Sequence, residues 1–321
     1  MAPRASAGRQ SWRVFTNLRT FLERGRGSTT QRLCVAAADD HDTLVAVSEA
    51  VELDLVEPIL VGEASAIRRG LDRVGMSPKG VEVIDCVDPA EIARSSAQMV
   101  GHGEADLLMK GRISTADIMR AILDPDAGLR IDGGGEGGRR RLISHLALFD
   151  IPGFDRLIGL TDAGINIAPD LDSKKDIIRN AAEAFHILLG TTPRVAALAA
   201  IEKVNKAMPA TVEARELEEA AGRGELGDVW VEGPLALDCA VDQRAAQGKG
   251  LKGDVAGRAD VLLVPDIEAG NISAKSITYF GRGIMVGILV GTKAPVILNS
   301  RVDVPAARLA SILAGVLLAQ K

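Results

Sequence analysis

The segment from Gly103 to Leu123 combines cations, a hydroxyl group and a helix start in a spacing that suits the binding of an anion. The apolar run from Asp106 to Lys110 predicts a buried strand, and the residues from Ser114 onward follow a helical period. Ser114 and Asp117, three positions apart, are typical of a capping box, in which the serine caps the helix. Because the first N–H groups of a helix attract anions, the segment predicts an anion site at a strand-to-helix turn.

The cations of this segment strengthen that prediction. Lys110 and Arg112 flank the turn, and Arg120 lies two turns into the expected helix. A guanidinium binds phosphate through two parallel hydrogen bonds. We therefore expect Arg120, Lys110, Ser114 and Thr115 to bind a phosphate-bearing substrate. The alternative is an ordinary strand-to-helix turn with solvated charges.

Composition narrows the class of protein. The chain has 321 residues, of which 47% are hydrophobic and 3% aromatic, and a formal net charge of −5. This length suggests two domains. The aliphatic residues and 34 glycines favour alternating helices and parallel strands. Interspersed charges and scarce aromatic residues argue against a nucleic-acid surface. We expect no membrane partner, because no apolar run reaches transmembrane length, and we expect a cytoplasmic location.

The cysteines and histidines give no support for a metal site. Cys34, Cys86 and Cys239 are odd in number and far apart, so neither a disulfide framework nor a zinc site is indicated, and we expect buried thiols. The four histidines lack metal-ligand spacing. Three G-x-G-x-x-G matches, the first at Gly133, do not lead from a strand into a helix, and there is no Walker A sequence. A metal or nucleotide cofactor is therefore not expected.

The hydrophobic pattern predicts a three-layer α/β/α architecture. After an amphipathic N-terminal helix containing Trp12, Phe15, Leu18, Phe21 and Leu22, strands alternate with helices. Such alternation specifies a parallel sheet with right-handed crossovers, in which ligands bind at the carboxyl ends of the strands. The strands expected in this first part are residues 32–38, 56–63, 81–86 and 106–110, and the helices are residues 42–55, 64–75, 88–103 and 114–123.

A second α/β domain is expected after the glycine-rich connection at residues 128–141. Two apolar strands around Pro152 and Gly153 suggest a hairpin. The final strand and helix resemble the units of the first domain, so the chain is expected to return to it. The first domain then comprises residues 1–139 and 287–321, the second comprises residues 140–286, and the active-site cleft lies between them. The further strands expected are residues 194–201, 228–237, 260–267 and two within 285–300, and the helices are residues 172–189, 213–221, 242–247 and 305–320.

Seven ordered sequence blocks resemble the phosphate acetyl/butyryltransferase family, and its phosphate butyryltransferase branch most closely. The resemblance covers about residues 34 to 316. The blocks are KGRISTADIMRAIL, SHLALFDIPGFD, LTDAGINIAPDL, AIEKVNKAMPAT, GPLALDCAV, VLLVPDIEAGNISAKSITYF and KAPVILNSR.

The resemblance implies the two-domain fold shared with isocitrate and isopropylmalate dehydrogenases, and a reversible reaction of acyl-CoA with phosphate to give acyl phosphate and CoA. The family's catalytic Ser-Arg dipeptide matches Ser300 and Arg301, and its helix arginine that binds phosphate or CoA matches Arg120. In the sequence, Asn299, Ser300 and Arg301 follow a buried strand, and Asp303 with Pro305 starts the next helix. These residues are therefore expected on a ligand-facing turn.

One departure from the family pattern concerns the group that receives the thiol proton. Acetyl-specific members carry a carboxylate seven residues after the serine, where this chain has Ala307. Asp303 could substitute, or it could serve as the cap of the next helix. A second family arginine, from the segment before Asp106, has no clear match. Phosphate binding is therefore expected to rely on Lys110 or Lys275.

A further polar group follows the apolar run before Asp266. Asn271 could donate to a carbonyl or phosphate oxygen, and Lys275 one turn later could neutralise it. Alternatively, Asn271 caps the helix and Lys275 is solvated. Asp162 and Asn166 are weaker candidates that could equally fix their own loop.

The residues and the resemblance together predict a short-chain phosphate acyltransferase that prefers butyryl to acetyl groups. It would transfer the acyl group directly in a ternary complex, with Ser300, Arg301 and Asp303 as catalytic residues and no cofactor beyond its substrates, a CoA thioester and phosphate. A homodimer is expected. The alternatives are a phosphate acetyltransferase, a β-hydroxyacid dehydrogenase, whose metal-binding carboxylates and NAD(P) loop are not found, and a non-catalytic binding protein for CoA or acyl phosphate.

Overall fold

The computed structural model describes residues 18–25, 27–133, 136–300 and 303–320. Its contacts divide the chain into two compact units. Unit 1 contains the described residues up to Arg130, then Met285–Ile288, and those from Thr292 onward. Unit 2 contains the described residues of Ile131–Ile284 and Leu289–Gly291. In this division the chain leaves unit 1, forms unit 2 and returns.

Unit 1 is built on parallel strands in the order β3-β2-β1-β4-β11. Strand β4, which lies between β1 and β11, is buried at every position, which explains its apolar run. The carboxyl ends of β1, β4 and β11 are neighbours, because each of these strands pairs with the next. The strands are β1 (Gln31–Ala36), β2 (Val56–Gly62), β3 (Glu82–Asp85), β4 (Leu107–Lys110) and β11 (Val296–Ile297).

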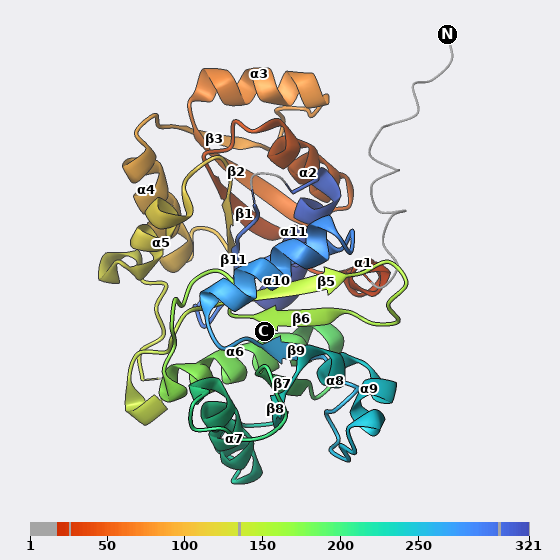
Figure 1. The fold of residues 1–321 in the computed structure, drawn as a ribbon. Helices are drawn as coiled ribbons and strands as arrows, with labels where there is room; N and C mark the ends of the chain where they lie inside the picture. Colours follow the sequence, from red (N-terminus) through yellow and green to blue (C-terminus); the bar gives the residue numbers. More distant parts are fainter. Residues whose placement is uncertain (1–17, 26, 134–135, 301–302, 321) are drawn as a thin grey trace. The chain divides into compact units, whose positions relative to one another are not determined.

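Helices cover both faces of the unit 1 strands. On one side α2 packs against α3 and α11, and on the other α4 packs against α5 (Figure 1). Leu18 and Phe21, at the N-terminal helix, are fully buried, whereas Trp12 and Phe15 lie outside the described residues. The helices are α1 (Arg19–Gly25), α2 (His41–Glu52), α3 (Ala64–Val74), α4 (Pro89–Gly101), α5 (Thr115–Leu123), the 3-10 turn η3 (Pro125–Ala127) and α11 (Pro305–Ala319).

Local capping bonds fix where the unit 1 helices begin. Asp40 accepts a hydrogen bond from the backbone N–H of Thr43 at the start of α2, and Asp88 caps α4 in the same way. Ser114 accepts the backbone N–H of Asp117, which confirms the capping box predicted for α5. Each cap satisfies a donor that the helix itself cannot pair.

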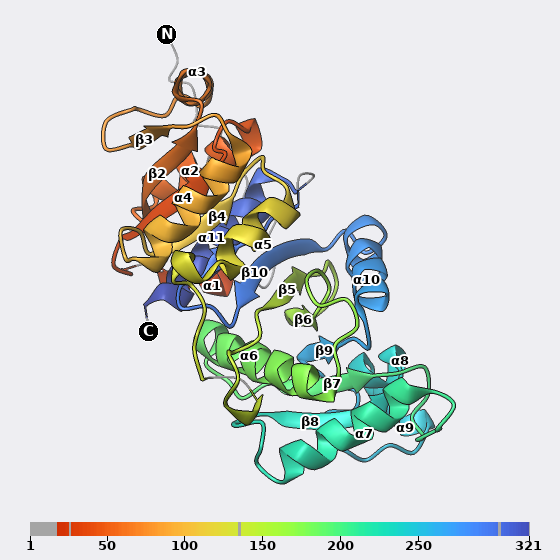
Figure 2. The same ribbon diagram turned by 90° about the vertical axis from the view of Figure 1, so that its left-hand side faces the viewer.

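Unit 2 combines an antiparallel pair with parallel strands in the order β5-β6-β9-β7-β8. The β5–β6 pairing confirms the predicted hairpin. Helix α7 packs on β7 and β8 (Figure 2). The strands are β5 (Ser144–Asp150), β6 (Ile158–Thr161), β7 (Arg194–Leu198), β8 (Trp230–Leu235), β9 (Val261–Leu263) and β10 (Ile284–Val290), the last of which has residues in both units. The helices are the 3-10 turn η4 (Glu136–Gly138), α6 (Leu171–Leu189), α7 (Pro209–Gly222), α8 (Leu237–Val241), α9 (Gln243–Gly248) and α10 (Ile267–Tyr279).

The predicted three-layer α/β class is confirmed, and two local predictions are wrong. Asp303 does not cap the last helix, because α11 begins at Pro305 with Val304 in the cap position. Cys86 is only half-buried, unlike the fully buried Cys34 and Cys239. Within the described ranges, no helix has both the length and the apolar character needed to span a membrane.

Candidate active site

A polar cavity of about 100 Å³ lies at the carboxyl ends of β1, β4 and β11 in unit 1. This edge is where open parallel sheets bind ligands. The loop after β1 contributes Asp40, the end of β4 contributes three residues, and the turn after β11 contributes two. Its lining residues are Asp40, Lys110, Gly111, Arg112, Asn299, Ser300 and Arg308. Three cations among seven residues make the cavity suited to a small anion.

Lys110 is the last residue of β4, and only 3% of it is exposed. Its Nζ lies 3.3 Å from the carbonyl oxygen of Gly111 and 3.4 Å from that of Asn299. Gly111 lets the chain turn here, because a Cβ at this position would lie 2.3 Å from the carbonyl oxygen of Ala37. The backbone therefore holds the ammonium group against the turn after β11.

Arg112 follows β4 by two residues and also lines the cavity, but it is mostly exposed, with a side-chain exposure of 66%. Its guanidinium pairs with both carboxylate oxygens of Asp39. Asp39 belongs to the loop after β1, so this ion pair links the loops that follow two neighbouring strands. The predicted position of Lys110 and Arg112 on either side of the turn agrees with this geometry.

The turn after β11 is organised by a buried carboxylate. Asp303, which is 8% exposed, accepts hydrogen bonds through Oδ2 from the Ser300 backbone N–H at 2.7 Å and from Asn299 Nδ2 at 3.3 Å. Asn299 Nδ2 also donates to Ser311 Oγ at 3.1 Å. The Ser300 hydroxyl has no hydrogen bond to any described residue. Asp303 thus fixes the turn and leaves that hydroxyl available, while Arg301 lies outside the described residues.

Two further cavity residues, Asp40 and Arg308, are missed by the sequence analysis. Arg308 is 3% exposed on α11, and its Nη1 lies 2.8 Å from Asp40 Oδ2. Nη1 also donates to the Thr43 hydroxyl, and Nε donates to the Asp303 carbonyl oxygen at 3.1 Å. In the sequence, Arg308 stands out as a charged residue within a largely apolar helix. A charged side chain is buried at such a position only when a partner compensates its charge, and this could have indicated a partner for Arg308.

The other predicted residues of the β4–α5 segment do not line this cavity. Thr115 and Arg120 are exposed, and the Arg120 guanidinium pairs with Asp117 at 2.9 Å. The Ser114 hydrogen bond, and secondarily Arg120, holds the pKa of the Asp117 carboxyl below its usual value. Ser114 is the N-cap of α5 and Thr115 is its first residue, whereas Arg120 lies in its last turn.

In unit 2, Asn271 and Lys275 lie on the exposed surface of α10. Asp266 caps this helix by accepting the backbone N–H of Ala269 at 2.8 Å. The alternative interpretation of Asn271 as the cap is therefore wrong. Neither Asn271 nor Lys275 has a hydrogen bond or ion pair to another residue in the part of the chain that is described.

Asp162 organises the loop after β6 through five donors. Only 2% exposed, it accepts backbone N–H bonds from His145, Gly164, Ile165 and Asn166, and a side-chain bond from Asn166 Nδ2 at 2.6 Å. A carboxylate saturated in this way holds its loop in place. Of the two interpretations of Asp162 and Asn166, this geometry favours loop fixation.

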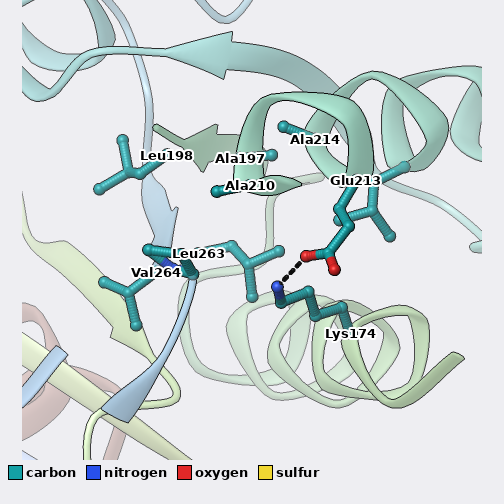
Figure 3. A pocket seen from close by; sticks show the side chains of 10 residues that line it. Lys174, Ala197, Leu198, Ala210, Glu213, Ala214, Leu263 and Val264 are labelled. Carbon is teal, nitrogen blue, oxygen red and sulfur yellow. Dashed lines mark hydrogen bonds and ion pairs between the residues drawn. The ribbon is translucent and has the colours of Figure 1, made fainter. Parts of the chain in front are cut away.

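A second cavity, between α6, α7 and the ends of β7 and β9, is too small for an organic ligand. Figure 3 shows Lys174 and Glu213 paired within it, among apolar side chains that include Leu198 and Val264. Its free volume is about 10 Å³, close to the minimum that holds one water molecule. The Lys174–Glu213 pair is therefore a structural ion pair in which the lysine is buried and the glutamate is half-exposed.

One group of side chains in unit 2 has atoms close enough to share a cation. Oxygen and sulfur atoms of Glu202, Asp238 and Cys239 lie within 4.8 Å of one another. Lys249 already occupies this position, with Nζ 2.7 Å from Glu202 and 3.5 Å from Asp238. Burial raises the pKa of the Cys239 thiol, which disfavours the thiolate that a metal would need.

Comparison with known proteins shows which family the chain resembles. The family model described as Phosphate acetyl/butaryl transferase matches residues 88–313. The chain is 38% identical to the phosphate butyryltransferase of Clostridium beijerinckii over 95% of this chain and 98% of that protein. It is 37% identical to the phosphate acetyltransferase of Rhizobium meliloti, over 89% and 88% of the respective chains.

A solved structure shows the same likeness. The crystal structure of a branched-chain phosphotransacylase from Enterococcus faecalis V583 superposes with a TM-score of 0.76 at 29% identity, covering 91% of this chain and 99% of that one. Because the family model matches most of the chain and relatives above 30% identity extend over nearly all of it, the predicted family is confirmed. The chain belongs to the phosphate acetyl/butyryl transferase family of acyltransferases.

Proposed function

We propose that this protein transfers a short acyl group reversibly between CoA and phosphate, with butyryl preferred to acetyl. The unit 1 cavity supports this proposal most directly, because it brings cations and an available serine hydroxyl to the carboxyl ends of three parallel strands. The butyryl preference rests on the similarity to the Clostridium beijerinckii phosphate butyryltransferase. Coenzyme A and phosphate are substrates in this reaction, and no further cofactor takes part.

The chemistry requires two things of the cavity. Negative charge develops on the carbonyl oxygen during attack, and the Ser300 hydroxyl donates a hydrogen bond to it. The phosphate needs compensating charge, which Lys110 and Arg301 supply. Asn299 and Asp303 keep the Ser300 turn in its position. Transfer is direct, since holding both substrates in one complex replaces a bimolecular encounter.

Residues outside the cavity complete the proposed substrate site. Arg120, with Ser114 and Thr115 at the start of its helix, binds the phosphate or the phosphates of CoA. In unit 2, Asn271 and Lys275 offer an exposed amide and an exposed cation to an anionic substrate. We further propose that the protein acts as a homodimer in the cytoplasm.

The first experiment measures thioester absorbance with acetyl-, propionyl-, butyryl- and isobutyryl-CoA, each with and without phosphate. We expect loss of thioester that depends on phosphate and is fastest for butyryl-CoA or a similar short chain. Each additional methylene in a fitted pocket changes kcat/KM by roughly 10- to 200-fold. A preference for acetyl-CoA of about tenfold or more would overturn the butyryl assignment, and binding without turnover would indicate a binding protein.

The second experiment tests the direct mechanism. Initial rates measured at several concentrations of both substrates should give intersecting lines in a double-reciprocal plot. A covalent acyl-serine would instead give parallel lines and could be trapped on Ser300 when the second substrate is omitted. Either of those results would refute direct transfer.

A further inference from the structure

The cavity contains one carboxylate to which the proposed reaction has so far given no role, that of Asp40. The position seven residues after Ser300 is Ala307, a buried residue of α11 that cannot accept a proton. The next residue, Arg308, forms an ion pair with Asp40, which lies in the loop after β1 of unit 1. We propose that Asp40 is the catalytic base and acid that exchanges the proton with the CoA thiol, an assignment that rests on the proposed function.

The hydrogen bonds of Asp40 divide its two oxygens into different roles. Oδ2 accepts hydrogen bonds from the Thr43 backbone N–H at 3.0 Å and from the Thr43 hydroxyl at 2.7 Å, and it forms an ion pair with Arg308 Nη1 at 2.8 Å. Oδ1 has no hydrogen bond to any residue that the structure describes. Since Asp40 lines the cavity and 26% of its side chain is exposed, the carboxylate is held through one oxygen and presents a second, basic one.

The other carboxylates near the cavity are used differently. Asp39 pairs through both oxygens with Arg112 and does not line the cavity. Asp303 is 8% exposed, lies outside the lining, and binds the Ser300 backbone N–H and the Asn299 amide. Asp40 is thus the carboxylate that is both anchored and open to a ligand among the described residues around this cavity.

The proton transfers balance without any additional reactant. In thioester formation, the thiol sulfur of CoA attacks the carbonyl carbon of the acyl phosphate, and the S–H proton passes to Asp40 as the S–C bond forms. The carbonyl π electrons move to oxygen and then return, breaking the C–O bond and leaving its electron pair on phosphate. Asp40 gives its proton to that phosphate oxygen, so hydrogen phosphate leaves and the carboxylate is regenerated.

Several charged groups surround Asp40. Arg308 faces it from α11, and Lys110 and Arg112 line the same cavity from the end of β4. On its own loop and helix, Asp40 is flanked by Asp39, His41 and Asp42. Asp303 precedes α11, and its carbonyl oxygen binds the same Arg308 guanidinium.

Asp40→Asn tests the assignment because asparagine caps a helix as well as aspartate and can still accept from Thr43. We expect kcat to fall by about 10²-fold or more, with little change in the KM for phosphate. The unfolding midpoint should fall as well, because the buried Arg308 loses its charged partner. Asp39→Asn is the matched control. It neutralises the adjacent carboxylate, which lies outside the cavity lining, and should keep kcat within a few-fold of wild type.

The pH profile separates a base from a structural anchor. Wild-type kcat/KM should decline on the acid side as the carboxylate becomes protonated, and Asp40→Asn should lack that decline. If Asp40 only anchors Arg308, Asp40→Asn will raise the KM for phosphate, retain kcat and retain the acid decline, and the assignment is wrong. If the wild type is active and Asp40→Asn and Asp39→Asn have equal kcat, the assignment of Asp40 is also wrong. If the wild type is inactive, the proposed function is wrong as well.

Discussion

Replacing Asp303 by alanine should disable the Ser300 turn while leaving the fold intact. The carboxylate accepts two hydrogen bonds from described residues, and the shorter one, 2.7 Å from the Ser300 backbone N–H, is charge-assisted. Hydrogen bonds to charged groups contribute about 1.5–3 kcal/mol, so the free energy of unfolding should fall by about that amount. A domain of ordinary stability, about 5–15 kcal/mol, survives such a loss.

The catalytic effect should be comparable. A displacement of about 1 Å at a positioned catalytic group costs up to about 100-fold, so we expect kcat for butyryl-CoA and phosphate to fall about 10- to 100-fold. KM should change little, because the Ser300 hydroxyl acts on charge that develops in the transition state. Ser300→Ala alone should lower kcat by about 10²-fold or more.

A double-mutant cycle tests whether Asp303 acts through Ser300. In the Ser300→Ala background, Asp303→Ala should cost little additional kcat but its full loss of unfolding free energy. Asp88→Ala is the control, because Asp88 also accepts a backbone N–H, at 2.8 Å, but caps α4 away from the cavity lining. Full activity of Asp303→Ala, or additive losses of kcat in the cycle, would refute the proposed positioning role.

Three further substitutions test other parts of the structure. Arg120→Lys keeps the charge but loses the bidentate hydrogen bonding of the guanidinium. The binding free energy of phosphate or CoA should therefore weaken by about 1–3 kcal/mol, with folding unchanged. An unaltered KM for both substrates would show that Arg120 is not part of the site. In Asp162→Asn an NH2 group replaces one carboxylate oxygen, so at least two of the five donors lose their acceptor. The free energy of unfolding, measured in urea, should fall by about 3 kcal/mol or more; a loss below about 1 kcal/mol would contradict the role of Asp162 in fixing the loop. Burial raises the pKa of Cys34 from 9.0 to about 12, so between these values the unfolded state binds fewer protons and stability should decline with rising pH by up to about 1.4 kcal/mol per unit. Cys34→Ala should decline less steeply, and equal slopes would show that another group is responsible.

The sequence was sufficient for features that depend on neighbours along the chain. Strand β4, the turn at Gly111 and the start of α5 follow from an apolar run and from Ser114 with Asp117, all within fifteen or so positions. The family's Ser-Arg match also placed Ser300 at a strand end, because β11 and α11 are recognisable as a strand and a following helix.

Features that depend on distant partners were not predictable in this way. Asp303 looks like a helix cap by its position before Pro305, but its carboxylate turns back to the Ser300 N–H three residues earlier. Such local side-chain bonds compete with capping, and sequence spacing does not decide between them. Asp40 and Arg308 meet only because β1 and β11 flank β4, so their pairing requires the sheet order.

The return of the chain to unit 1 also has a consequence for biosynthesis. Lys110 and Asn299, whose atoms meet at the cavity, are 189 positions apart. At about 5–20 residues per second, a ribosome needs roughly 10–40 s to synthesise the intervening chain. During that time one edge of β4 lacks the strand β11 that later pairs with it, and open strand edges promote aggregation. Unit 2, whose residues are nearly continuous, can fold before unit 1 is complete, so the cavity would be the last part of the nascent protein to form.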